Sequence, residues 1–261
     1  MRCLVVVDDK DKNKNVDADQ EEDSGRRKFL KNAGVFTGGV VGAGFLGGVI
    51  GHNWWDDSDT ATETKTSPDF SEARIFFNRR EDFNVLSWAT ERIFPEDENG
   101  PGAILLGVPY FIDKQLAGPW GKNADDYMRG PFKEGEETQG FQSPLNRGEI
   151  FIQGIREINK VSNKKFKASF PELEEEQQNE VLMMFENGEV DLKNVSSTRF
   201  FGLLRQATLE GAYADPLYGG NRNMDGWRMK EFPGAQSAYI NEIEEEDFIK
   251  MDPISLSDYN K

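Results

Sequence analysis

Apolar residues recur at intervals of three or four in five stretches of the chain beyond residue 76, and this spacing predicts five amphipathic helices. The predicted helices cover residues 78–94, 101–117, 145–162, 172–186 and 197–210. Few stretches alternate between apolar and polar residues as a half-buried strand would. The pattern therefore predicts an all-α fold, a single compact helical domain of about five helices joined by long loops.

Capping and helix-breaking residues place the ends of these helices. A capping box begins at Asn78, and Pro101 suits the first turn of the second predicted helix. Asn187-Gly188 closes the fourth helix, and the fifth begins at a cap on Ser197 or the next residue.

The rest of the chain has a different pattern, and the sequence divides into five segments. Residues 1–25 form an acid-rich leader with too little apolar surface to offset the entropy of folding, so this leader is expected to be disordered. Residues 26–55 form an apolar segment that begins with a basic pair, residues 56–75 a polar tether and residues 76–235 the helical domain. Residues 236–261 form an acidic tail, interpreted either as solvated or as a helix that packs against a partner.

The apolar segment has the layout of an export signal, because basic residues precede an uncharged run from Asn32 to Trp55. Its first residues resemble the twin-arginine signal S-R-R-x-F-L-K through Arg26, Arg27, Phe29, Leu30 and Lys31, although Gly25 stands directly before the arginines. The resemblance implies the twin-arginine (Tat) translocase as a partner and a location on the extracytoplasmic face of the cell membrane.

Cleavage of this signal stays open. As a helix the run from residue 32 to residue 55 would be roughly 36 Å long, which is enough to span a bilayer. Its many glycines make it a poor permanent anchor, yet no A-x-A cleavage site precedes the polar tether.

The same segment contains GAGFLG, residues 42–47, which matches the dinucleotide fingerprint G-x-G-x-x-G. A cofactor loop of that kind follows a strand of bulky residues and precedes an acid that binds the ribose, and the glycine-rich surroundings here supply neither. We therefore interpret these residues as part of the export signal and predict no cofactor site in this chain.

Charge and residue counts exclude several functions. The formal net charge is -16, and residues 1–55 contain as many basic as acidic residues, so the whole excess lies beyond them. Such a surface repels phosphate, which disfavours nucleic acid as a partner. The only cysteine is Cys3 and the only histidine is His52, so the predicted domain lacks cysteine nucleophiles, Cys/His metal ligands, haem attachment and histidine-based triads. A hydrolase built on paired carboxylates remains open.

Two stretches, residues 89–121 and 209–235, carry a resemblance to a known family. The first contains Ile-Phe-Pro, Gly-Pro-Gly-Ala and Phe-Ile-Asp, and the second contains Asp-Pro-x-Tyr-Gly-Gly-Asn, Gly-Trp and Phe-Pro-Gly. Together they resemble the small subunit, subunit 3 or gamma, of membrane-bound gluconate 2-dehydrogenase. Glu231 departs from the family pattern, which usually has glycine there, and this puts the local turn in question.

The resemblance implies a partner subunit, not a catalyst. In that family a large FAD-containing subunit of the glucose-methanol-choline (GMC) oxidoreductase type oxidises the sugar, and a multihaem cytochrome c subunit usually accepts the electrons. The small subunit carries the export signal for the large one. The resemblance thus implies FAD in the partner, haem c in a cytochrome subunit and no cofactor in this chain.

The second stretch is the candidate site, with two interpretations. Its members are Asp215, Pro216, Tyr218, Gly219, Gly220, Asn221, Gly226, Trp227 and Pro233. They form either a tight turn with Trp227 in the core, or a loop whose Tyr218 and Trp227 are exposed and dock on the flavoprotein. An exported, membrane-tethered binding or scaffold protein without a dehydrogenase partner is the alternative function.

Overall fold

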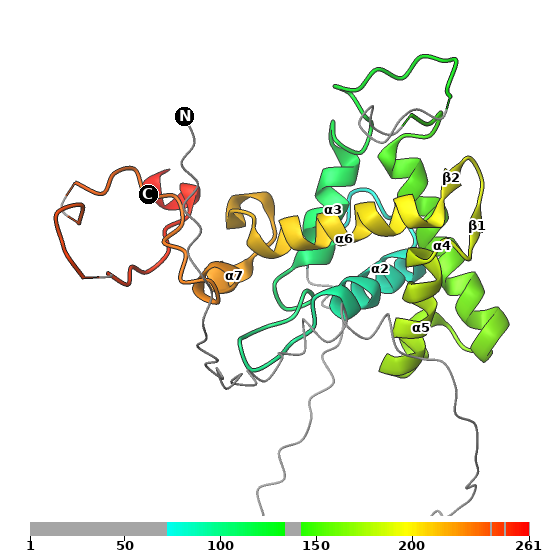
Figure 1. Cartoon of the computed structure of the whole chain (residues 1–261), viewed down its shortest axis with the longest axis horizontal. Helices are drawn as coiled ribbons and strands as arrows, with labels where there is room; N and C mark the ends of the chain where they lie inside the picture. The colour runs from blue at the N-terminus through cyan, green and yellow to red at the C-terminus, as the bar shows by residue number, and fades with distance from the viewer. Residues whose placement is uncertain (1–71, 134–141, 241, 248, 261) are drawn as a thin grey trace, which may run out of the picture.

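The computed structural model describes residues 72–133, 142–240, 242–247 and 249–260 (Figure 1). The α-helices of this part are α2 (Arg80–Ile93), α3 (Val108–Ala117), α4 (Arg147–Phe166), α5 (Glu175–Glu186), α6 (Ser197–Tyr213) and α7 (Asp225–Arg228). Strands β1 (Asp191–Leu192) and β2 (Val195–Ser196) pair in a small antiparallel hairpin. The described chain is therefore mostly helical, as the apolar spacing predicted.

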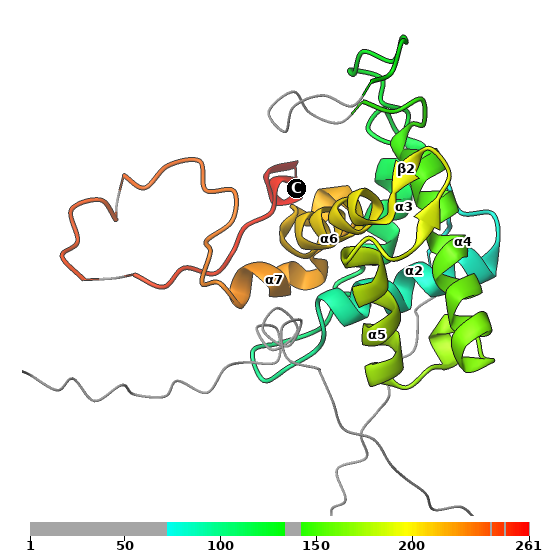
Figure 2. The ribbon, with the colours of Figure 1, turned by 45° about the vertical axis from the view of Figure 1, so that its right-hand side comes forward.

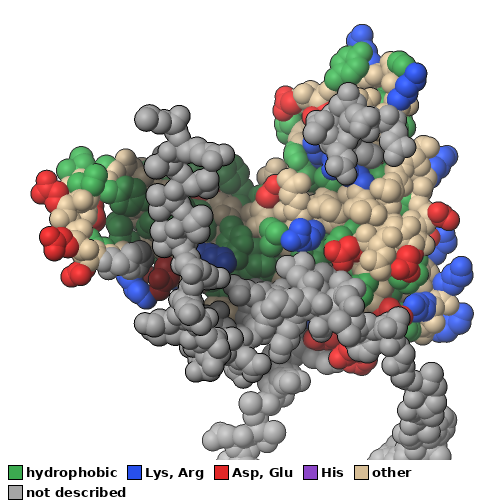
Figure 3. Space-filling view, in the orientation of Figure 1, with side chains coloured by type: hydrophobic (Ala, Val, Ile, Leu, Met, Phe, Trp, Pro, Cys, Tyr) green, Lys and Arg blue, Asp and Glu red, His purple; other side chains and the backbone are tan. Residues whose placement is uncertain are grey.

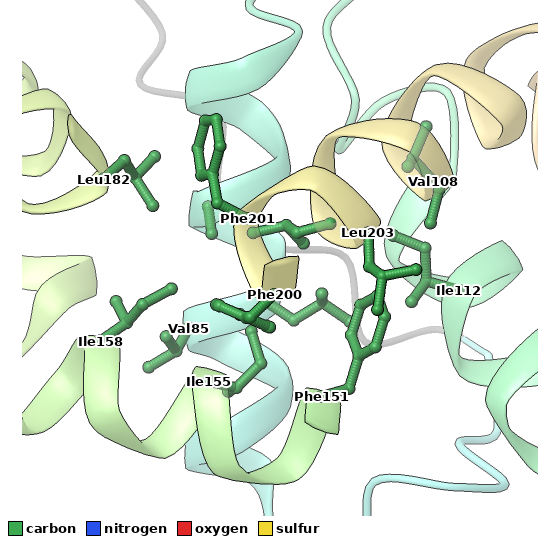
Figure 4. Close-up of a cluster of buried hydrophobic side chains, with 14 of the residues drawn as sticks. Val85, Val108, Ile112, Phe151, Ile155, Ile158, Leu182, Phe200, Phe201 and Leu203 are labelled. Carbon is green, nitrogen blue, oxygen red and sulfur yellow. The ribbon is translucent and has the colours of Figure 1, made fainter. Parts of the chain in front are cut away.

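Helix α6 lies at the centre of the domain, where it contacts α2, α3, α4 and α5 (Figures 1 and 2). The core is built from fully buried apolar side chains, among them Val85 of α2, Ile112 of α3, Ile155 of α4 and Phe200 of α6 (Figure 4). Helices α4 and α6 approach closely at Gly154, where an added Cβ would lie 2.3 Å from the ring of Phe200. One continuous core thus joins all the long helices.

The first predicted helix is present, but its predicted cap is wrong. Helix α2 begins at Arg80 with Arg79 as its N-cap, and no side chain caps it. Asn78 lies one residue further out. The backbone just before Asn78 binds to α3 instead, because the amides of Ile75 and Phe77 donate to the carboxylate of Asp113.

The second predicted helix begins later than expected. Helix α3 starts at Val108, so Pro109, not Pro101, lies in its first turn. Gly107 has a φ of 75°, a left-handed conformation that separates the preceding turns from the helix. A side chain of α2 stabilises these turns, since the carboxylate of Glu91 accepts the amide of Ile104.

The remaining predicted helices differ from the observed ones only at their ends. A capping box of Asn146 and Glu149 begins α4, which continues four residues past the predicted end to Phe166. Helix α5 ends at the predicted Asn187-Gly188. Helix α6 is capped by Ser196, one residue before the predicted position, because its hydroxyl accepts from the amide of Arg199.

Candidate docking surface

The sequence Asp-Pro-Leu-Tyr-Gly-Gly-Asn forms a tight turn directly after α6. Residues Pro216–Tyr218 make one turn of 3-10 helix, capped by Asp215, whose carboxylate accepts the amide of Leu217 at 2.9 Å. Gly219 has a φ of 93°, which favours glycine. Of the side chains on this turn, Leu217 and Tyr218 are 56% and 51% exposed. The loop thus has the geometry of a tight turn, and this turn presents the side chains of Leu217 and Tyr218 to solvent.

Asn221 fastens this turn to the end of α6. Its side chain is fully buried, donates to the carbonyl of Ala214 at 2.8 Å and accepts from the amide of Gly226 at 2.8 Å. The neighbouring glycines allow close approach: a Cβ on Gly220 would lie 2.2 Å from the carbonyl oxygen of Gly211, and one on Gly226 would lie 2.0 Å from that of Ala212. The loop is thus held rigidly against the helix by backbone contacts that only glycine permits.

Trp227 is largely buried, although it also lines one of the surface hollows described below. Its side chain is 6% exposed, its indole Nε1 donates to the carbonyl of Tyr213 at 2.8 Å, and its ring meets Phe232 edge to face. The interpretation that Tyr218 and Trp227 are both exposed is therefore wrong for Trp227. Glu231, where the family usually has glycine, lies in the turn after Trp227. It adopts a left-handed conformation with a φ of 50°.

A comparison with known protein families covers the same loop. The family model for gluconate 2-dehydrogenase subunit 3 matches residues 80–234, which is more than half of the chain and includes the whole loop. The chain belongs to the gluconate 2-dehydrogenase subunit 3 family. Members of this family are subunits of a gluconate 2-dehydrogenase complex. Neither the curated proteins nor the solved structures include a match to this chain.

Residues 215–221, which we call the family loop, lie beside two hollows that share Tyr213. One, of about 530 Å³, is lined by Phe111, Gln115, Glu210, Ala214, Asp215 and Tyr218. The other, of about 430 Å³, is lined by Trp227, Lys230, Glu231, Phe232 and Pro233. With the exposed rings of Tyr218 and Phe232 at their edges, the two hollows form a largely apolar face, which we call the docking surface.

The segment that enters the domain is fastened beside the same loop. Glu72 accepts from Lys114 at 3.0 Å and from Arg222 at 2.6 Å, and the guanidinium of Arg222 lies over the ring of Tyr110. Burial alone would raise the pKa of Glu72, but the hydrogen bonds from Arg222 and Lys114 outweigh it and hold the pKa below its ordinary value. Arg222 directly follows the family loop, so the chain enters the domain next to the docking surface.

Two further carboxylates within the residues matched to the family, Asp113 and Glu91, accept hydrogen bonds from backbone amides. Asp113, which is fully buried, accepts the amides of Ile75, Phe76 and Phe77 at 2.6, 3.1 and 2.8 Å. Glu91 accepts the amides of Glu96 and Ile104, and burial raises its pKa.

Glu91 also explains a family glycine. A Cβ on Gly102 would lie 2.0 Å from its carboxylate oxygen, so the Gly-Pro-Gly-Ala sequence permits this contact. Neither Glu91 nor Arg222 is among the site residues predicted from the sequence. Glu91 could have been found from the sequence, because it is an acidic residue at a position of α2 that the helical spacing buries.

The described residues contain no group of three or more His, Cys, Asp or Glu side chains that could hold a metal ion. Over the same residues, no helix combines the length and apolarity needed to cross a bilayer. The expected export-signal residues Arg26, Arg27, Phe29, Leu30 and Lys31, together with Cys3, His52 and residues 42–47, lie outside the described part of the chain.

Proposed function

We propose that this chain is the non-catalytic small subunit of a membrane-associated, FAD-dependent dehydrogenase that oxidises gluconate or a related sugar or polyol. In this proposal it binds a large GMC-type subunit that contains FAD, accompanies it through the twin-arginine translocase, and supports its maturation and stability. A multihaem cytochrome c subunit accepts the electrons, as the family resemblance implies. The assembled complex lies on the extracytoplasmic face of the membrane.

The observation that carries this proposal is the family match over residues 80–234. The geometry of the family loop supports a binding role, because its polar and glycine residues are used to fix the backbone while Leu217 and Tyr218 remain exposed. Large aromatic side chains on a preorganised surface contribute strongly to protein interfaces. The lack of any His or Cys beyond residue 52 supports a subunit whose partner carries the redox chemistry.

Purification of the tagged full chain from its native host tests this function. We expect an FAD-containing subunit to elute with it in a fixed ratio, and the complex to oxidise gluconate or a related sugar with an artificial electron acceptor. The same chain expressed alone should show no flavin absorbance and no such activity. A flavin bound to the chain alone would contradict the non-catalytic role. Recovery of the exported chain without any flavoprotein would favour the scaffold alternative.

A further inference from the structure

The chain continues past the family match into a loop that exposes large apolar side chains. We call residues 236–252 the C-terminal arm, of which residues 236–240, 242–247 and 249–252 are described. Ile240 and Ile243 are 78% and 77% exposed, and Tyr239 is exposed as well. The amide of Ile243 donates to the carbonyl of Tyr239 at 2.9 Å. This bond brings the backbones of Tyr239 and Ile243 together, and Ile240 directly follows Tyr239 in the sequence.

The arm leaves the domain and returns to it through a fixed root. The amide of Ala235 donates to the carbonyl of Ile254 at 2.8 Å, and the amide of Ile254 donates to the carbonyl of Pro233 at 3.2 Å. The hydroxyl of Tyr259 donates to the carbonyl of Ala235. Ser255 is buried, so the expectation of a solvated tail up to residue 261 is wrong for this returning segment. The root places the arm beside α7, where Figures 1 and 2 show it projecting from the helical body.

One carboxylate fixes both the family loop and the root of the arm. Asp215 caps the turn that carries Tyr218, and it also accepts from the hydroxyl of Ser255 and the amide of Leu256, both at 2.8 Å. These contacts join residues 40 and 41 positions apart in the sequence. The root of the arm therefore has a set position relative to the docking surface.

The charges on the arm restrict what it can contact. Glu244, Glu245, Glu246 and Asp247 are consecutive and exposed, and Figure 3 shows acidic side chains along the outer edge of the arm beside hydrophobic ones. A second copy of this chain, with its net charge of -16, would repel them, and so would nucleic acid or an anionic membrane. A protein surface with basic residues around an apolar socket has the complementary chemistry.

We infer that the C-terminal arm is a second docking element for the subunit that the docking surface binds. The apolar turn of Tyr239, Ile240 and Ile243 enters a socket on the FAD-containing subunit, and Lys and Arg side chains around that socket pair with residues 244–247. This inference rests on the proposed function. It adds the chemistry of the contact and a binding element that lies beyond the family match.

The test measures the affinity of the full chain for the purified FAD-containing subunit. The double variant Ile240→Ser/Ile243→Ser should keep the melting temperature of the wild type and weaken binding about 30-fold or more. The control is Ile75→Ser, which alters an isoleucine that is 61% exposed in a different groove, lined by α3 and α4. This control should bind within about threefold of wild type.

A second pair of variants tests the charge complementarity. Glu245→Lys should weaken binding most at low salt and reduce the salt dependence of the affinity, because a paired acid has been reversed. Glu176→Lys reverses an equally exposed acid on α5 and should change neither property.

The outcomes separate this inference from the proposed function. Failure of the wild-type chain to bind any FAD-containing subunit overturns both. If the wild type binds and Tyr218→Ala weakens binding, but the double isoleucine variant binds as tightly as wild type, the arm is not a docking element and the proposed function stands. An arm whose variants change only self-association of the chain would also overturn the inference.

Discussion

The buried side chain of Asn221 accepts the amide proton of Gly226 at 2.8 Å, and through this bond the family loop is tied to the helix that carries Trp227. The amide nitrogen of the same side chain donates to the carbonyl of Ala214, the C-cap residue of α6. A single side-chain amide thus joins the end of α6 to the start of α7.

Asn221→Ala should lower the free energy of unfolding by about 2–4 kcal/mol, because it leaves a buried amide and a buried carbonyl without their partner. Urea denaturation followed by circular dichroism measures this change. Asn223→Ala is the matched control, since Asn223 is also left-handed, with a φ of 56°, but its side chain is exposed. The control should lose only the local backbone preference, about 1 kcal/mol. Equal losses in the two variants would show that the side-chain hydrogen bonds of Asn221 contribute nothing.

Trp227→Ala should destabilise the fold. Removing this buried ring leaves a cavity and costs about 3–5 kcal/mol, a large part of the 5–15 kcal/mol typical of a domain. Thermal unfolding measures the loss. A melting temperature unchanged from wild type would contradict the assignment of Trp227 to the core.

Tyr218→Ala should leave the fold intact and weaken binding to the FAD-containing subunit by about 2 kcal/mol, or roughly thirtyfold. The reason is that Tyr218 is half exposed on a rigid turn, so its loss removes interface area without a cavity. Titration calorimetry of the two subunits measures the affinity. The control, Tyr127→Ala, alters a tyrosine that is 82% exposed and lies outside the docking surface. Wild-type affinity for the Tyr218 variant would place the interface on the helical faces instead.

Replacing Arg26 and Arg27 together by Lys should leave this chain and its flavoprotein inside the cell. Lysine keeps the positive charge, so a loss of export would depend on the arginine side chains themselves. Fractionation of cells with an immunoblot for both subunits measures the location. Normal extracytoplasmic dehydrogenase activity in the double variant would contradict the export role.

Glu72→Gln should remove a pH-dependent part of the stability. The pKa of Glu72 is lowered in the folded state. Its ion pairs with Lys114 and Arg222 therefore stabilise the fold fully at pH values above 4.5, the ordinary pKa of a glutamate. This contribution is lost as the pH falls through the lower folded-state value. The difference in melting temperature between wild type and Glu72→Gln should therefore be largest near neutral pH and disappear in acid. If the difference in melting temperature stays constant with pH, the loss of stability comes from packing and not from charge.

The long helices could be predicted from the sequence because, in each, apolar residues recur at helical intervals over several turns and so line one face. The start of α3 could not, since it depends on the carboxylate of Glu91, which is on another helix and binds Ile104. The two-residue strands of the hairpin are too short to show an alternation. The root of the arm is fixed by Asp215 from a distant part of the sequence, and such a contact has no local signal.

The candidate loop shows the same division between local and distant information. The positive φ of Gly219 and the cap on Asp215 follow from the residue types of a tight turn. The burial of Trp227 and the exposure of Tyr218 depend on where α6 ends, so the sequence left both interpretations open. The contact between Glu72 and Arg222 joins residues 150 positions apart and could only be found in three dimensions.

The contacts of Glu72 and Asp113 also set a limit on distance. Because the chain is fixed to α3 from residue 72 onward, only residues 56–71 separate the domain from the end of the apolar segment. An extended chain spans at most about 3.6 Å per residue, so this length reaches no further than about 60 Å. If the apolar segment stays in the bilayer, this length keeps the start of the domain within about 60 Å of the membrane surface. The proposed flavoprotein, and any acceptor of its electrons, would then have to lie close to the membrane.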